Sequence, residues 1–246
     1  MTTQLSANVN KVATLRNTRH VGVPNVARAA RICLDAGAHG VTVHPRPDQR
    51  HIRPHDVAEI AALVAGYPNA ELNIEGNPFH GLVELAEQHR PAQCTLVPDD
   101  EAQATSDHGW NLAEDGDKLR PIVARLRALG ARVSLFMDAD ASTIAAARDV
   151  GADRVELYTE PYAAAFARGE HASLLGVFRD AAIAAQRAGL GVNAGHDLSL
   201  DNLAPFLAAV PDVLEVSIGH ALIADAIEMG LAEAVRRYRA LCAAAT

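Results

Sequence analysis

Short apolar runs, most of them closed by a polar residue, recur along the chain and alternate with longer segments rich in Ala, Leu and Arg. Such runs are typical of buried strands, and most of the longer segments have helical spacing. The runs are Ser6–Asn10, Val41–His44, Leu72–Glu75, Thr95–Pro98, Val133–Asp138, Val155–Leu157, Val192–His196 and Val216–His220. Parallel strands that alternate with helices and gather polar side chains at one end are typical of a (β/α)8 TIM barrel. The pattern predicts this α/β fold and an enzyme.

Turn signals place the individual elements. After the first run, the expected strands are His39–His44, Glu71–Glu75, Gln93–Val97, Arg132–Met137, Arg154–Tyr158, Gly191–Ala194 and Val213–Ile218. The expected helices are Pro24–Ala36, Asp56–Ala65, Pro78–His89, Lys118–Leu129, Ser142–Val150, Pro161–Gly169, Ala172–Ala188, Leu200–Ala209 and one that runs from about Ala221 to Cys242. Pro45–Pro54 is expected to be a rigid basic loop. Asp99–Asp115 is expected to be a long polar loop over the strand ends, and loops of that length are often functional.

Length and composition fit one enzyme domain. The 246 residues match the usual size of such a barrel, so we expect a single catalytic domain over residues 1–246. The net charge of −8 argues against a nucleic-acid partner, and no apolar run has the roughly 20 residues of a membrane span. No signal-peptide pattern is present. Cys33, Cys94 and Cys242 have unrelated spacings, so we expect reduced thiols in a cytoplasmic protein.

The loop after the second run carries candidate chemistry. His44 closes a strand, where an imidazole can face the barrel mouth and exchange protons near neutral pH. Arg46, Arg50 and His51 follow as cationic donors for a phosphate group, a task that suits the planar guanidinium. The alternative interpretation is a solvated loop with ordinary surface charges.

Three acidic residues also lie in strand-like runs. Glu75 ends an apolar strand, where partial shielding from water can raise its pKa and make it a general base, although it could instead pair with Arg46. Glu156 alternates with apolar neighbours and is expected to point into the barrel, where a carboxylate needs a partner or a function. Asp138 fits a helix N-cap as well as it fits a site residue.

The segments Asn193–His196 and Ile218–Ala221 place small residues at the ends of the last two strands. Barrel enzymes often bind phosphate on backbone N–H groups of these loops, and simple turns are the alternative explanation. Glu75 and the strand-end histidines could also bind a divalent metal. However, the first strand has no His-x-His pair and the strand ends have no dense set of carboxylates, so no metal site is expected.

These motifs resemble the pyridoxine 5'-phosphate synthase family across nearly the whole chain. The matching segments are Asn8–Arg19, Gly40–Arg46, Arg50–Ile52, Leu72–Glu75, Leu96–Pro98, Val133–Asp140, Val192–His196 and Ile218–Ala221. The resemblance implies a (β/α)8 barrel with extra helices, assembled as a homo-octamer built from dimers. It also implies the condensation of 1-deoxy-D-xylulose 5-phosphate with 3-amino-2-oxopropyl phosphate to pyridoxine 5'-phosphate, phosphate and water. Because one substrate carries its own amine, no cofactor is expected.

The resemblance implies roles for individual residues. His44 and Glu75 are expected to accept protons, His196 to donate one, and Glu156 to stabilise a transition state. The expected ligands of the aminoketone phosphate are Asn8, Arg19, Gly219 and His220. The expected ligands of deoxyxylulose phosphate are Arg46, His51 and Thr105, together with Asn10 and Lys11, which stand where well-known members have Asp-His. Asp197, next to His196, stands in place of a glycine and is also expected in the substrate site.

Two alternatives remain open from the residues themselves. One is a different phosphosugar barrel enzyme, such as an epimerase or a Schiff-base aldolase, which would need Lys11 as its nucleophile. The other is a barrel without catalysis that binds a phosphorylated metabolite or serves as an assembly scaffold.

Overall fold

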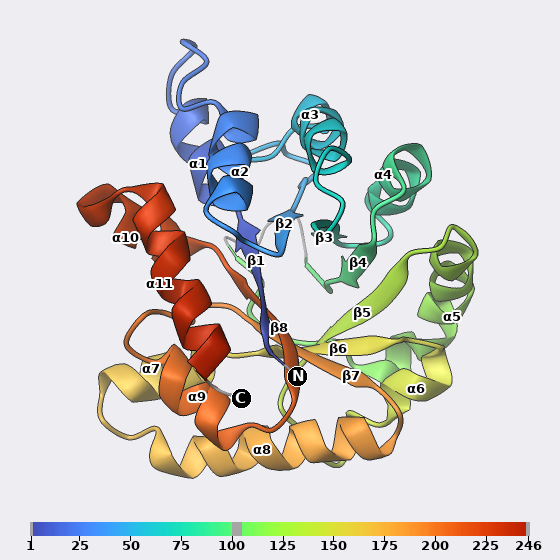
Figure 1. The fold of residues 1–246 in the computed structure, drawn as a ribbon. Helices are drawn as coiled ribbons and strands as arrows, with labels where there is room; N and C mark the ends of the chain where they lie inside the picture. Colours follow the sequence, from blue (N-terminus) through green and yellow to red (C-terminus); the bar gives the residue numbers. More distant parts are fainter. Residues whose placement is uncertain (1, 100–104, 245–246) are drawn as a thin grey trace.

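Eight parallel strands close into a barrel in the computed structural model, which describes residues 2–99 and 105–244 (Figure 1). Each strand pairs with the next one along the chain, and β8 pairs with β1 to complete the ring. The strands are β1 (Gln4–Asn8), β2 (Gly40–Val43), β3 (Glu71–Gly76), β4 (Gln93–Leu96), β5 (Arg132–Met137), β6 (Arg154–Tyr158), β7 (Gly191–Gly195) and β8 (Val213–Ile218). The (β/α)8 barrel predicted from the apolar runs is confirmed.

Helices surround the barrel (Figure 1). Most lie between successive strands, and the last two follow β8. They are α1 (Asn10–Asn17), α2 (Val26–Asp35), α3 (Pro54–Val64), α4 (Leu82–His89), α5 (Leu112–Ala128), α6 (Ala146–Val150), α7 (Glu160–Ala167), α8 (Ala172–Arg187), α9 (Leu203–Ala209), α10 (His220–Met229) and α11 (Leu231–Ala244). As predicted, the short α7 precedes α8 between β6 and β7 as an additional helix. No helix in the described ranges is long and apolar enough to cross a membrane.

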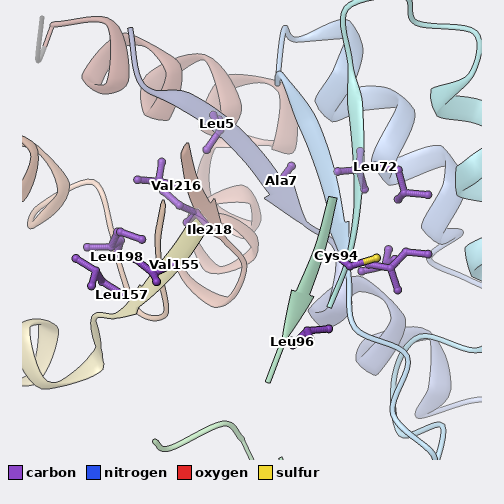
Figure 2. Packing of buried hydrophobic residues seen from close by; sticks show 14 of the residues in the cluster. Leu5, Ala7, Leu72, Cys94, Leu96, Val155, Leu157, Leu198, Val216 and Ile218 are labelled. Atoms are coloured by element: carbon purple, nitrogen blue, oxygen red, sulfur yellow. The ribbon is translucent and has the colours of Figure 1, made fainter. Parts of the chain in front are cut away.

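The main hydrophobic core lies between the barrel and the helices. Leu5 and Ala7 on β1 and Val216 and Ile218 on β8 are buried in this layer together with side chains from the surrounding elements (Figure 2). Because strand side chains alternate, these apolar residues leave the intervening polar ones to face the inside of the barrel. Burying one side chain of this size stabilises the fold by about 1.5–3 kcal/mol, so this layer fixes the strands that carry the site.

The inside of the barrel is polar, whereas branched aliphatic residues fill most barrels of this kind. Its buried side chains include Ser6, Thr42, Asn73, Gln93, Thr95, Ser134, Glu156, Asn193 and Glu215. Thr42 Oγ1 lies 2.7 Å from Ser6 Oγ and accepts a hydrogen bond from Asn73 at 3.3 Å. Gln93 on β4 donates to Glu215 on β8 at 3.1 Å, across the barrel rather than between neighbouring strands. These bonds offset the cost of removing polar groups from water.

Several predicted boundaries are wrong. The helix expected from Lys118 begins at Leu112, so the end of the expected loop Asp99–Asp115 is helical, and acidic residues in its first turn suit the helix dipole. Residues 100–104 of that expected loop lie outside the described residues. The single helix expected from about Ala221 to Cys242 is two helices, because Gly230 adopts a left-handed φ of 84° between them. The helices expected from Pro78 and Ser142 begin four residues later, and α1 was not predicted.

Candidate active site

A cavity of about 780 Å³ opens at the carboxyl ends of the strands. Active sites of this fold are built at that end, from the loops that follow the strands. The predicted site residues that line the cavity are Asn8, Asn10, Lys11, His44, Arg46, His51, Glu75, Thr105, Glu156, His196, Asp197, Gly219 and His220. Arg19 does not line it, because it lies exposed on the segment after α1. Residues from distant parts of the sequence therefore converge as expected.

Glu75 and His44 lie side by side in the cavity wall. Glu75 Oε1 accepts a hydrogen bond from Asn8 Nδ2 at 3.2 Å and lies 3.5 Å from His44 Nδ1. The two side chains are only 12% and 7% exposed. Asn10 Oδ1 accepts a hydrogen bond from the His44 backbone N–H at 2.9 Å. Asn8 on β1 therefore orients the Glu75 carboxylate, and Asn10 on α1 holds the backbone of His44.

Asp99 is a buried member of this cluster that the sequence did not reveal. Its Oδ2 lies 3.1 Å from His44 Nε2 and accepts a hydrogen bond from Arg46 at 2.6 Å. Its Oδ1 accepts one from Ser106 Oγ at 2.6 Å. Burial alone would raise the pKa of Asp99, but His44, Ser106 and Arg46 outweigh burial and lower it to about 2. The only available signal was a carboxylate three residues after the end of β4, in a segment that was interpreted as a surface loop.

The two carboxylates determine the charge of His44. Burial alone would lower the pKa of this imidazole, but the hydrogen bonds and charges of Asp99 and Glu75 outweigh burial and raise it to about 9. His44 is therefore an imidazolium at neutral pH in the protein without substrate.

His51, in contrast, is neutral. Burial and the positive charges of His44, Arg46 and Lys11 lower its pKa to about 3. Its Nδ1 accepts a hydrogen bond from the Ile52 backbone N–H at 3.0 Å, which leaves Nε2 as the protonated nitrogen. The sequence-based description of His51 as a cationic donor is therefore wrong, although its neutral N–H can still donate.

Side chains of α1 hold the loop after β2, which carries Arg46, Arg50 and His51. Asn17 Nδ2 donates to the backbone carbonyls of Arg50 and His51, at 3.1 and 2.8 Å. Arg16 also donates to the His51 carbonyl and forms a buried ion pair with Asp56 in the first turn of α3. The loop is therefore fixed at its base, and Arg46 and Arg50 extend from it into the cavity wall.

His196 adopts a strained backbone after β7. Its φ is 89° and that of Asp197 is 59°, in a region that glycine favours and that can cost about 1–3 kcal/mol for other residues. Thr159 Oγ1 donates to the His196 carbonyl at 2.6 Å, and Thr105 Oγ1 lies 2.9 Å from His196 Nε2. The carboxylate of Asp197 lies 3.4 Å from His196 Nδ1. The backbone strain and these contacts direct the His196 ring into the cavity.

Glu156 is almost completely buried at the floor of the cavity. Thr95 Oγ1 donates to its Oε2 at 3.4 Å, and its Oε1 lies against Gly195, where a Cβ would overlap with it. Burial, followed by the charges of Glu75 and Glu215, raises the pKa of Glu156 well above its usual value. This environment favours the proton-bearing form of the carboxyl group.

The part of the cavity wall that follows β8 contains a helix N-terminus. Gly219 precedes α10 and lies against Asn8, so that a Cβ there would come within 3.1 Å of the Asn8 amide. His220 is the first residue of α10, and Ser217 on β8 also lines the cavity. The first backbone N–H groups of a helix have no partner within it and favour anions.

Other residues of the mouth have structural tasks. Asp138 accepts a hydrogen bond from the Gly109 backbone N–H at 3.1 Å and does not line the cavity. Trp110 donates from its indole to the Leu96 carbonyl at 2.8 Å. Together they attach the end of the loop after β4 to the barrel. Within residues 2–99 and 105–244, no group of three or more His, Cys, Asp or Glu side chains is arranged to hold a metal ion.

The sequence model of the family described as pyridoxal phosphate biosynthesis protein PdxJ matches residues 5–244. The chain belongs to this family. A relative from Albidiferax ferrireducens, named pyridoxine 5'-phosphate synthase, is 58% identical over 243 residues, which cover 97% of this chain and 96% of the relative. One of the same name from Xanthomonas campestris is 56% identical over 250 residues, with 99% and 97% covered. The family membership that the sequence motifs indicated is thereby confirmed.

Solved structures of lower identity share the barrel with this PdxJ family member. Thiamine phosphate pyrophosphorylase from Pyrococcus furiosus superposes with a TM-score of 0.63 at 14% identity, covering 98% of this chain and 96% of that one. A tryptophan synthase structure from M. tuberculosis gives a TM-score of 0.64 at 12% identity, with 98% and 94% covered. At such identities the similarity shows the fold alone.

Proposed function

We propose that this chain is a pyridoxine 5'-phosphate synthase. It condenses 1-deoxy-D-xylulose 5-phosphate with 3-amino-2-oxopropyl phosphate and releases phosphate and water. Membership of the PdxJ family over residues 5–244 carries the proposal. The arrangement of the cavity supports it, because imidazole and carboxyl groups line one space of about 780 Å³.

The reaction needs several proton transfers, since an amine joins a ketone, water and phosphate leave, and an aromatic ring closes. We assign these transfers to His44, Glu75 and His196, with Glu156 stabilising a transition state. Positioned groups of this kind each contribute about 10²–10⁴-fold. Glu75 is held as an acceptor by Asn8, and the buried environment of Glu156 favours a carboxyl that can donate. Different carboxyl environments suit different steps.

Two phosphorylated substrates need two places for anions. For deoxyxylulose phosphate we assign Arg46, His51, Thr105, Asn10 and Lys11, with Asp197 at the edge of the site. His51 serves as a neutral N–H donor. For the aminoketone phosphate we assign Asn8, Gly219 and His220 of the cavity wall. The family resemblance adds Arg19, which lies exposed outside that wall. The N-terminus of α10 supports this second place.

We propose that residues 1–246 act as one catalytic domain without a cofactor, and that copies associate into a homo-octamer built from dimers. Exposed apolar side chains support association: Leu15, Val21 and Val23, around α1 and the segment after it, are 55%, 60% and 63% exposed. We also propose a cytoplasmic location. The unpaired thiols of Cys33, Cys94 and Cys242 fit a reducing compartment.

The decisive experiment is incubation of the purified chain with both substrates. We expect a product with the mass and the absorbance of pyridoxine 5'-phosphate, and none when either substrate is omitted. Binding without turnover would instead support a metabolite-binding barrel. Covalent trapping of Lys11 by borohydride with a single sugar phosphate would support a Schiff-base aldolase.

A further inference from the structure

Both ring nitrogens of His44 face carboxylates, and the two carboxylates lie on different sides of it. Glu75 Oε1 lies 3.5 Å from Nδ1 and belongs to the wall of the large cavity. Asp99 Oδ2 lies 3.1 Å from Nε2 and lines a small adjoining pocket instead. Asp99 is therefore behind the ring, while Glu75 lies on the side where a substrate enters.

A carboxylate accepts hydrogen bonds and donates none when it is ionised. Two such neighbours are satisfied together only when both nitrogens of His44 carry protons. The same oxygen of Asp99 also accepts from Arg46 at 2.6 Å, and Ser106 occupies the other oxygen. Asp99 is thus a shared partner for the imidazole and for the guanidinium beside it.

We propose that Asp99 is a positioning residue of the synthase reaction. From behind the ring it keeps His44 doubly protonated and holds Arg46 at the deoxyxylulose phosphate end of the site. His44 then begins the reaction as a proton donor rather than as the acceptor that the family resemblance implies. This inference rests on the proposed function and refines it. A carboxylate that orients a catalytic histidine from behind is a recurring device in enzymes.

In the first transfer, the proton on Nδ1 of His44 moves to a substrate oxygen, and the N–H bonding pair stays on the nitrogen. The ring becomes neutral and keeps its Nε2 proton toward Asp99. It can accept a proton at Nδ1 only in a later step. Glu75, whose Oε1 lies 3.5 Å from Nδ1 in the cavity wall, is the group placed to accept first.

The charges around the ring are consistent with this assignment. Glu75 comes from β3, Asp99 follows β4, and Arg46 and His51 lie in the loop after β2; Lys11 of α1 lines the same cavity. Arg46 already pairs with Asp99. His51, whose ring centroid is 5.9 Å from that of His44, is neutral and adds no repelling charge.

Nitrogen NMR of histidine side chains tests the protonation state without any turnover. The His44→Asn variant identifies the His44 signals in the substrate-free protein. We expect both nitrogens of His44 to carry protons at neutral pH, and Asp99→Asn to lower the pH at which the ring becomes neutral. A single protonated nitrogen at neutral pH in the unsubstituted protein would overturn the proposal, and so would an unchanged titration in Asp99→Asn.

Kinetics then test the positioning role. We expect Asp99→Asn to lower kcat by about tenfold or more, to move the basic limb of the kcat profile to lower pH, and to raise the KM for deoxyxylulose phosphate. Asp99→Glu should recover part of kcat and the imidazolium signal. Asp107 is an exposed carboxylate in the same loop, and Asp107→Asn is the matched control. It should leave kcat, the pH profile and the KM for deoxyxylulose phosphate unchanged.

The two proposals can fail separately. If the unsubstituted chain forms no pyridoxine 5'-phosphate, the proposed function fails, and the NMR titration still decides whether Asp99 holds His44 protonated. If the chain is active and Asp99→Asn matches it in kcat, pH profile and KM, only the inference about Asp99 fails.

Discussion

The backbone of Gly195 lies directly against the carboxyl group of Glu156, with no room for a side chain between β7 and this buried acid. We expect Gly195→Ala to displace the carboxyl group, to lower kcat by about tenfold or more, and to destabilise the fold by about 1–3 kcal/mol, as overpacking does. Turnover and urea unfolding measure the two effects.

Gly176→Ala is the matched control, because position 176 lies in α8 and a Cβ there would come no nearer than 4.0 Å to the neighbouring Arg179 side chain. A helical Gly→Ala change there should stabilise by about 0.5–1 kcal/mol and leave activity unaltered. Equal activity of the two variants would show that Glu156 does not need its observed position.

Removing either proton-transfer group should abolish most turnover. We expect Glu75→Gln and His44→Asn each to lower kcat by about a hundredfold or more, because each loses a positioned acid or base. Glu87→Gln, an exposed carboxyl on α4 that pairs with Arg125, controls for a general effect of the substitution. Circular dichroism must show folded variants. Near-normal kcat in a folded variant would remove that residue from the mechanism.

Arg46→Ala should mainly weaken the binding of deoxyxylulose phosphate. A hydrogen bond to a charged group contributes about 1.5–3 kcal/mol, which corresponds to a rise in KM of about 10- to 100-fold. Steady-state kinetics with each substrate varied in turn measure it. Arg179→Ala, on the outer helix α8, is the control. If the KM for deoxyxylulose phosphate stays the same, Arg46 does not bind that phosphate.

His51 should contribute to acid sensitivity. Its pKa is about 3 in the folded protein against an ordinary value of 6.5, so between these values the unfolded chain binds the additional proton. Stability from this group is therefore present above about pH 6.5 and declines as pH falls toward 3. We expect His51→Gln to flatten the dependence of the unfolding free energy on pH in this interval. Parallel curves for both proteins would contradict the neutral state of His51.

The regular elements could be predicted because they depend on local patterns. The bounds of β5, β6 and β8 agree with the sequence-based prediction to the residue, since apolar runs between glycine and polar turns define them. The start of α5 at Leu112 was not predictable in the same way. A polar segment is interpreted as a loop unless its acidic residues are recognised as the first turn of a helix.

The predicted site residues also came together, with the exception of Arg19. Their charge states could not be predicted, because they depend on contacts between distant segments. His44 and His51 lie in one short segment, yet a carboxylate from β3 and one from the segment after β4 contact only His44. Asp99 was missed for the same reason, since its charged partners Arg46 and His44 are 53 and 55 positions away along the chain.

The polar interior of the barrel limits how the protein can change. The amide nitrogen of Gln93 donates a hydrogen bond to Glu215, and its amide oxygen accepts one from Asn193 at 3.3 Å. Replacing Gln93 alone by an aliphatic residue leaves two buried groups without these partners, whereas replacing the set together by well-packed aliphatic residues removes the penalty. Divergence inside the barrel therefore requires concerted substitutions. Single substitutions should therefore be tolerated more readily in the helices than at the inward-facing positions of the strands.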